Sequence, residues 1–179
     1  MRTFFAGILL LLGLGTVAAY MSMFIVHQNQ QAIVLQFGNP RKIITTPGLN
    51  WKLPVVETVE YFDKRILDLD TAPQEVTVSD QKRLVVDAFT RYRIVEPLKF
   101  YQTVRSIQNV RTTLGPIVDS SMRRVLGGVT FRDVVRDKRE ELIRRIAKQV
   151  NDEGKEFGIE VVDVRIKRAD LPRANSKAV

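Results

Sequence analysis

An uncharged apolar stretch near the N-terminus constrains this chain more than any other feature of its sequence. Phe4 to Val26 reads FFAGILLLLGLGTVAAYMSMFIV, 23 consecutive residues without a charged side chain. A helix of that length extends about 34 Å, which is enough to cross the roughly 30 Å hydrocarbon core of a bilayer. We therefore predict a transmembrane helix over residues 4–26, with Tyr20 as an anchor at the membrane–water interface.

A cleaved signal peptide is the alternative for the same stretch. Arg2 supplies a positive charge, Phe4–Gly15 an apolar region, and Val17–Ala19 small residues at which cleavage could occur. The apolar character continues for seven residues beyond Ala19, which a signal peptide does not require. The pattern therefore favours a retained anchor.

The cations that flank the apolar stretch indicate its orientation. Arg2 and the N-terminal amine precede it, whereas Arg41 and Lys42 come only 15 residues after its end. Because cytoplasmic flanks carry the excess of positive charge, this bias favours a cytoplasmic N-terminus and an external main domain.

Net charge limits the partners of the chain. Lys and Arg outnumber Asp and Glu by 28 to 20, a net charge of +8, which favours an anionic partner such as a lipid surface. Nucleic acid is not expected, because the Arg-rich stretch 132–148 has no interleaved Trp or Tyr and its acids offset much of its charge.

Few reactive groups are available for catalysis. The chain has no cysteine and one histidine, His27, so thiol chemistry, thiolate metal sites and a Ser–His–Asp triad lack partners. Asp87 lies in an apolar strand and could be a buried acid, but pairing with Arg91 or Arg93 on a solvated face is favoured. We predict no catalytic, cofactor-binding or metal-binding residues and no cofactor.

Alternation of apolar and polar residues predicts strands up to Val95. The clearest is Leu84–Val95, in which every second residue from Leu84 to Ile94 falls on one face. Shorter strands are predicted over 32–37, 55–61 and 66–69, with turns at Gly38–Pro40 and Pro47–Gly48.

Helical periodicity replaces alternation after Pro97. The first helix has one apolar stripe and ends at Gly127-Gly128, and Pro116 is expected to kink or split it. The stripe consists of Val110, Leu114, Ile117, Ser121 and Val125.

A second helix and a last strand complete the pattern. The helix is predicted over 131–157 and ends at Gly158. Its inward residues are Val135, Leu142, Ile146 and Val150. The strand over 159–167 places Val162, Val164 and Ile166 on one face, and Pro172 could open a helix that continues to Val179.

The Pro-bracketed segment 46–54 contains the single tryptophan. Trp51 and Lys52 favour the lipid headgroup layer, and Leu53 adds apolar surface beside them. We hypothesise that Trp51, Lys52 and Leu53 rest on the membrane. The alternative is that Trp51 packs into the β-rich core.

Charge also suggests how copies could pack side by side. We predict that the Arg-rich helix, through Arg144 and Arg145, faces an acidic patch around Asp68 and Asp70 on a neighbouring subunit.

Three segments together resemble the SPFH (stomatin, prohibitin, flotillin and HflK–HflC) family. They are QAIVLQFG at 31–38, PGLNWKLPVVETV at 47–59 and FGIEVVDVRIKRADLP at 157–172. The last is most similar to the bacterial HflC branch, and the resemblance spans nearly all of the chain.

The resemblance implies an α+β protein with four parts. These are a transmembrane helix (4–26), a β-rich SPFH half (27–95), an α/β SPFH half (96–170) and the start of a long assembly helix (171–179). It also implies a single-pass protein of the bacterial inner membrane whose main domain is periplasmic.

The implied function is that of a scaffold and not of an enzyme. Such a subunit would co-assemble with an HflK-like paralogue into a large hetero-oligomeric ring or cage around an FtsH-like membrane AAA+ protease. There it would restrain access to membrane substrates, in contact with membrane lipids. The alternative is a membrane-tethered hydrolase or ligand-binding domain that acts as a small unit.

Overall fold

The computed structural model describes the backbone of residues 2–170, and the side chains of this range except those of residues 2–6, 8–10, 18, 169 and 170. The chain divides into two compact units, Met1–Lys64 and Arg65–Val179. This division differs from the predicted boundary at Val95, because the long strand that precedes Val95 is the central strand of the second unit. The helix expected over 171–179 lies outside the described residues.

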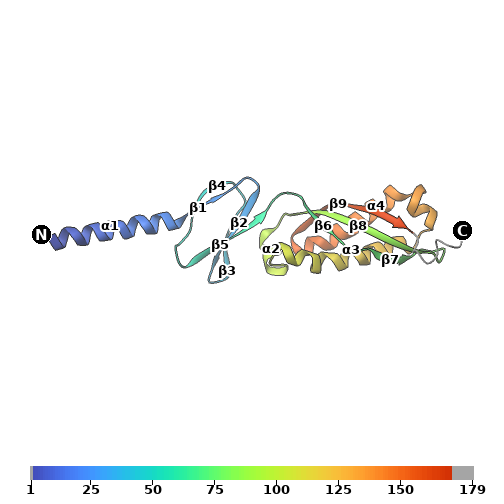
Figure 1. The fold of residues 1–179 in the computed structure, drawn as a ribbon, viewed down its shortest axis with the longest axis horizontal. Coiled ribbons are helices and arrows are strands. Elements are labelled where there is room, and N and C mark those ends of the chain that lie inside the picture. Colours follow the sequence, from blue (N-terminus) through green and yellow to red (C-terminus); the bar gives the residue numbers. More distant parts are fainter. Residues whose placement is uncertain (1, 171–179) are drawn as a thin grey trace. The chain divides into compact units, whose positions relative to one another are not determined.

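The first unit contains one helix and two small antiparallel sheets (Figure 1). Strand β1 pairs with β4, and β2 lies between β3 and β5. The elements are α1 (Arg2–Ser22), β1 (Met23–Val26), β2 (Gln30–Gln36), β3 (Asn39–Ile44), β4 (Gly48–Trp51) and β5 (Glu57–Asp63). Their shared core contains Phe24, Val26, Ala32, Val34 and Ile44, with Val59 packed against it.

The N-terminal helix ends earlier than the apolar sequence predicts. Helix α1 ends at Ser22, and Met23–Val26 forms β1 instead of a last helical turn. Pairing with β4 supplies hydrogen-bond partners for the backbone of residues 23–26. At the end of the helix, the N–H of Lys52 donates to the carbonyl of Ser22 at 2.8 Å. Within the described part of the chain, no helix is both long and apolar enough to cross a membrane.

The second unit is an antiparallel sheet with helices packed on one face. Strand β8 pairs with β6 and β7 along one edge and with β9 along the other. Helix α3 contacts β6 and β7, and α4 contacts β9 and α3 (Figure 1). The strands are β6 (Leu67–Asp70), β7 (Gln74–Thr77), β8 (Arg83–Ile94) and β9 (Ile159–Asp170). The helices are α2 (Pro97–Thr103), η1 (Ile107–Asn109), α3 (Val110–Leu126), the π-helical η2 (Asp133–Asp137), α4 (Arg139–Gly154) and η3 (Lys155–Phe157).

The order of strands and helices confirms an α+β protein with a β-rich first half and a helical second half. Every second residue of β8 from Leu84 to Ile94 is buried, which confirms the face predicted for this strand. Pro116 does not split its helix, since α3 is continuous from Val110 to Leu126. Buried residues on both sides of Pro116, Leu114 and Val118, hold the helix against the sheet.

Two predicted core positions are wrong by one residue. In η2 the buried residue is Val134 and not Val135, because a π-helical turn takes up an extra residue and rotates the following side chains. In β9 the buried residue is Val161 and not Val162. A β-bulge there interrupts the pairing with Arg91 and Tyr92 and shifts the alternation.

Candidate functional site

The short ladder between β1 and β4 presents apolar side chains to the outside. Met23 lies opposite Trp51, and Ile25 lies opposite Leu49. Residues directly opposite in an antiparallel pair project to the same face, while the intervening Phe24 points into the core. Met23, Ile25, Leu49 and Trp51 therefore form one exposed apolar surface, which we call the apolar ladder.

The apolar ladder adjoins the end of α1. Tyr20, on the last turns of α1, is 79% exposed and lines an open groove with Met23, Phe24, Ile25 and Leu49. The structure therefore brings Tyr20 next to the ladder, although about thirty residues separate it from Trp51.

Trp51 is not a core residue. Its side chain is 60% exposed, which contradicts the alternative of packing into the β-rich core. Leu53 is 57% exposed, and Lys52 is half-buried. All three predicted residues thus follow one another at the end of β4, beside the residue that ends α1.

The turn after β4 is closed by Glu57. Its carboxylate accepts a hydrogen bond from the N–H of Leu53 at 2.8 Å, and its own N–H donates to the carbonyl of Leu53 at 3.0 Å. This double contact holds the turn over 53–57 as a compact projection, with Val55 at 93% exposure within it.

Asp68 and Asp70 lie on the open face of the second unit's sheet, and each has a partner within the chain. Asp68 is 3.8 Å from Arg91, and Lys167 donates to Asp70 at 2.6 Å. The hydrogen bond to Asp70, together with the charges of Asp70 and Asp87, raises the pKa of Lys167. The predicted acidic patch is therefore part of an intramolecular network of ion pairs.

Further ion pairs continue this network across the open face. Arg93 donates to Glu160 at 2.5 Å, and this hydrogen bond raises the pKa of Arg93. Arg165 donates to Asp163 at 2.7 Å. Cations and acids alternate between β6, β8 and β9, as expected for a strand face in contact with water.

Arg144 and Arg145 lie on the exposed side of α4, opposite the buried Leu142 and Ile146. Neither forms an ion pair within residues 2–170. The structure thus leaves both guanidinium groups available, as the assembly prediction requires, while it does not bring them near Asp68 or Asp70 in the same chain.

Metal-ligating side chains do not gather in one place among the described residues. No group of three or more His, Cys, Asp or Glu among them could hold a metal ion. Asp87 lies half-buried opposite Arg168, on the face that carries the ion-pair network, and not in a closed apolar site.

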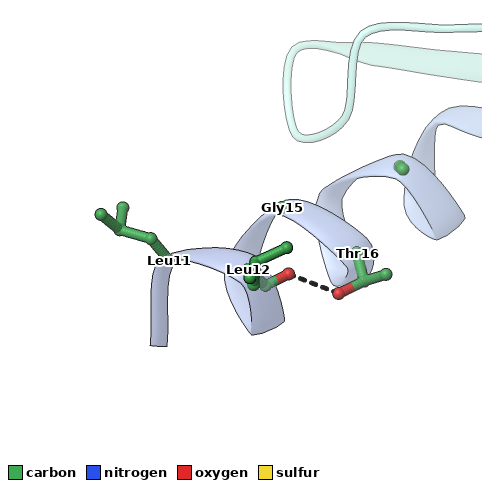
Figure 2. Close-up of a pocket in the computed structure, with 5 residues that line it drawn as sticks. Leu11, Leu12, Gly15 and Thr16 are labelled. Atoms are coloured by element: carbon green, nitrogen blue, oxygen red, sulfur yellow. Dashed lines mark hydrogen bonds between the residues drawn. The ribbon is translucent and has the colours of Figure 1, made fainter. Parts of the chain in front are cut away.

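The groove on α1 is equally poor in reactive groups. Leu11, Leu12, Gly15, Thr16 and Ala19 line it, and the Thr16 hydroxyl donates back to the carbonyl of Leu12 in its own helix (Figure 2). Its one polar side chain is therefore already satisfied, and nothing else in the groove could act on a substrate.

The sequence predicts neither the outward direction of Met23, Ile25 and Leu49 nor the turn at Val55, and it places the β2–β3 turn at Gly38–Pro40, one residue after its start at Phe37. The apolar run predicts a helix over Met23 and Ile25, whereas the structure places both in β1, where they alternate with buried Phe24 and Val26. Phe37 and Val55, 82% and 93% exposed, adopt positive φ angles that their residue types disfavour. No sequence signal predicts those angles.

Residues 24–179 match the model of the family described as SPFH domain / Band 7. The protein named HflC from Haemophilus influenzae is 28% identical over 171 aligned residues, which cover 89% of this chain and 58% of that protein.

Two further curated relatives show the same level of similarity. The modulator of FtsH protease HflC from Escherichia coli K12 is 27% identical over 210 aligned positions, covering 91% of this chain and 63% of that protein. The HflC protein of Buchnera aphidicola from Schizaphis graminum is 29% identical, with 88% and 59% covered. The chain thus spans about three-fifths of the length of the relatives it matches.

Proposed function

This chain belongs to the SPFH domain / Band 7 family, and from that premise we propose that it is a membrane-anchored scaffold subunit of the HflC type. In this proposal it co-assembles with an HflK-like paralogue into a large ring or cage. The assembly surrounds an FtsH-like membrane AAA+ protease and modulates the access of that protease to membrane substrates. The relative from Escherichia coli is named for modulation of FtsH, which supports the choice of protease partner.

The proposed anchor is the N-terminal segment. Its uncharged helical part, residues 4–22, extends about 28 Å, close to the thickness of a bilayer core, and its described large side chains, such as Leu11, Leu14 and Val17, are exposed. A helix that is apolar on its exposed sides requires an apolar surrounding. The flanking charges support a cytoplasmic N-terminus, and hence a periplasmic main domain in the bacterial inner membrane.

The apolar ladder is the single observation that carries the proposal furthest. It begins at the residue after α1, so an anchored chain would bring Met23, Ile25, Leu49 and Trp51 to the level of the lipid headgroups. Trp and Tyr are typical of that layer, and the half-buried Lys52 would meet lipid phosphates there. The ladder thus supports a main domain that lies against the membrane.

The partner proposal is tested by purification of the full chain from its native membrane in mild detergent. We expect a species of very high mass in which mass spectrometry finds a paralogous SPFH subunit and a membrane AAA+ protease. A monodisperse monomer with hydrolase activity would overturn the scaffold proposal in favour of a membrane-tethered enzyme.

The membrane contact is tested separately with the fluorescence of Trp51 in reconstituted liposomes. We expect brominated lipids to quench Trp51. The matched control is the double variant Trp51→Phe, Tyr61→Trp, because Tyr61 is also exposed but lies toward the other end of β5. Equal quenching of both reporters, or of neither, would contradict contact through the ladder.

A further inference from the structure

Four residues other than glycine have positive φ angles, and the two units use them differently. Within residues 2–170 they are Phe37, Val55, Gln81 and Arg105. All four are exposed, and the two in the second unit are polar, as water-facing turns normally are. The two in the first unit are an aromatic and a β-branched residue, so both the backbone and the surrounding water disfavour them.

Phe37 is at the tip of the β2–β3 hairpin. Gln36 pairs with Asn39, which leaves Phe37 and Gly38 as a two-residue loop with φ angles of 49° and 82°. Such a loop has the backbone of a type I′ turn, for which Asn-Gly is the favoured sequence. A phenylalanine at the first position therefore opposes folding and is explained by a partner that buries its ring.

Val55 has the same character in the turn between β4 and β5. Its φ angle is 71°, which is a strong outlier for a β-branched residue. The two hydrogen bonds between Leu53 and Glu57 hold this turn closed, so that Val55 projects from it.

Backbone pairing places both turns at the same end of the first unit, beside the end of α1. Gln36 lies opposite Glu57, so the Phe37 tip and the Val55 turn continue from adjacent strand ends. Lys52, which leads into the Val55 turn, donates its N–H to the carbonyl of Ser22, the last residue of α1. A continuous set of backbone contacts therefore joins the two turns to the helix.

We propose that Phe37 and Val55 are two prongs that insert into the acyl region of the bilayer. The inference rests on the proposed membrane contact and goes deeper than the headgroup layer assigned to Trp51. Residues 35–40 carry no charge, and the one charge of the turn over 53–57 is the Glu57 carboxylate at its base, which accepts from the Leu53 N–H. The nearest cations stand behind the tips: Arg41, which donates to the Gln36 side chain at 2.6 Å, and Lys52. Lipid is the occupant that fits apolar tips backed by cations, because phosphates lie directly above the acyl chains.

The test uses the full chain in liposomes with one tryptophan at a time. Phe37→Trp and Val55→Trp are each made in a Trp51→Phe background, and lipids brominated at graded depths along the acyl chain are used as quenchers. We expect both reporters to lose at least as much emission as native Trp51, and to lose most with deeper bromines. Trp51→Phe, Tyr61→Trp is the matched control and should keep its emission.

The outcomes separate this inference from the proposed function. Quenching of Trp51 without quenching at 37 and 55 overturns the prongs and leaves the membrane contact standing. A blue-shifted emission at 37 and 55 that no brominated lipid quenches identifies a protein partner and overturns lipid as the occupant. If one tryptophan variant fails to fold, the other still decides, since the pairing of Gln36 with Glu57 places both tips at one end.

Discussion

Gly158 shows how a single residue can determine the junction between helix and strand. Its φ angle is 70°, and its carbonyl accepts hydrogen bonds from the N–H groups of Val95 and Glu96. A Cβ atom at this position would overlap the carbonyl oxygen of Glu96 and lie 3.0 Å from the backbone nitrogen of Phe100. Glycine is therefore required where η3 turns into β9.

We expect Gly158→Ala to lower the free energy of unfolding by about 2–4 kcal/mol, because left-handed strain and a backbone clash act together. Urea unfolding of the full chain measures the change. Gly128→Ala is the matched control, since no atom lies within 4 Å of a Cβ built there and its φ angle is not left-handed. An equal loss in both variants would show that the effect is not specific to the junction.

Tyr92 makes the stability of the second unit depend on pH in the alkaline range. The side chain is 2% exposed, and burial raises its pKa to about 12. The unfolded chain releases the same proton near pH 10, so the folded state favours the neutral phenol. The stabilisation is complete below pH 10 and is lost as the pH rises towards 12.

Tyr92→Phe should therefore remove much of the decline in unfolding free energy between pH 10 and pH 12. Chemical unfolding of the full chain at a series of pH values measures it. Tyr101→Phe is the comparison, because that ring is only partly buried. A decline that stays unchanged in Tyr92→Phe would assign it to other groups.

At the scale of elements, the sequence predicts those whose periodicity is uninterrupted. The face of β8 is predictable because its buried positions recur at every second residue, and the end of α3 before Gly127 is predictable because glycine commonly terminates helices. The burial of Val134 and Val161 is not predictable from the sequence. The π-helical turn and the β-bulge each add one residue, and their presence depends on packing.

The candidate site divides in the same way. Residue type and position alone predict Tyr20, Trp51, Lys52 and Leu53 as membrane-interface residues, since aromatic and apolar residues near an apolar segment indicate an interface, and that role stays a prediction. Met23 and Ile25 were hidden because a fully apolar run conceals strand alternation. Their outward direction follows only from the pairing of β1 with β4.

The helical segment that contains η2 begins with a cap at Thr130, and the stability this cap contributes depends on pH. The Thr130 hydroxyl and N–H both donate to the Asp133 carboxylate, at 2.8 and 3.3 Å, and the Asp133 N–H faces the Thr130 oxygen at 3.4 Å. These hydrogen bonds lower the pKa of Asp133. Because the folded pKa is depressed, the contribution is present above the unfolded value near 4 and is lost as the pH falls through the folded value.

We expect Thr130→Ala to destabilise the chain by about 1 kcal/mol at pH 7 and by less at pH 3. Thr112→Ala should show no such pH dependence, because the Thr112 hydroxyl donates to the carbonyl of Asn109 and not to a carboxylate. Parallel urea titrations at the two pH values compare them. A Thr130→Ala effect that is the same at both would argue against the ionised cap.

At the scale of the whole molecule, charge is distributed unequally over the second unit. The acids of the open sheet face, Asp68 and Asp70 among them, have cations of the same chain beside them. On α4, Arg144 and Arg145 form no ion pair with an acid among the described residues. A side-by-side assembly that pairs the two surfaces must exchange intramolecular ion pairs for intermolecular ones. Exposed pairs contribute only about 0–1 kcal/mol each, so this exchange is possible.

The double variant Arg144→Glu, Arg145→Glu tests the exchange. If these residues contact Asp68 and Asp70 of a neighbour, the variant repels that neighbour and the mass of the assembly in mild detergent should fall. Adding Asp68→Arg and Asp70→Arg to the same chain should restore it, because every subunit then presents both reversed surfaces.

The wild-type assembly should also shrink as ionic strength rises, since exposed charges are screened beyond about 8–10 Å at physiological salt. Arg165→Glu, which disturbs only the pair with Asp163 on the open face, is the control for a general effect of added acid. An unchanged mass for the Arg144, Arg145 variant would remove α4 from the interface and leave the lateral contacts to other surfaces.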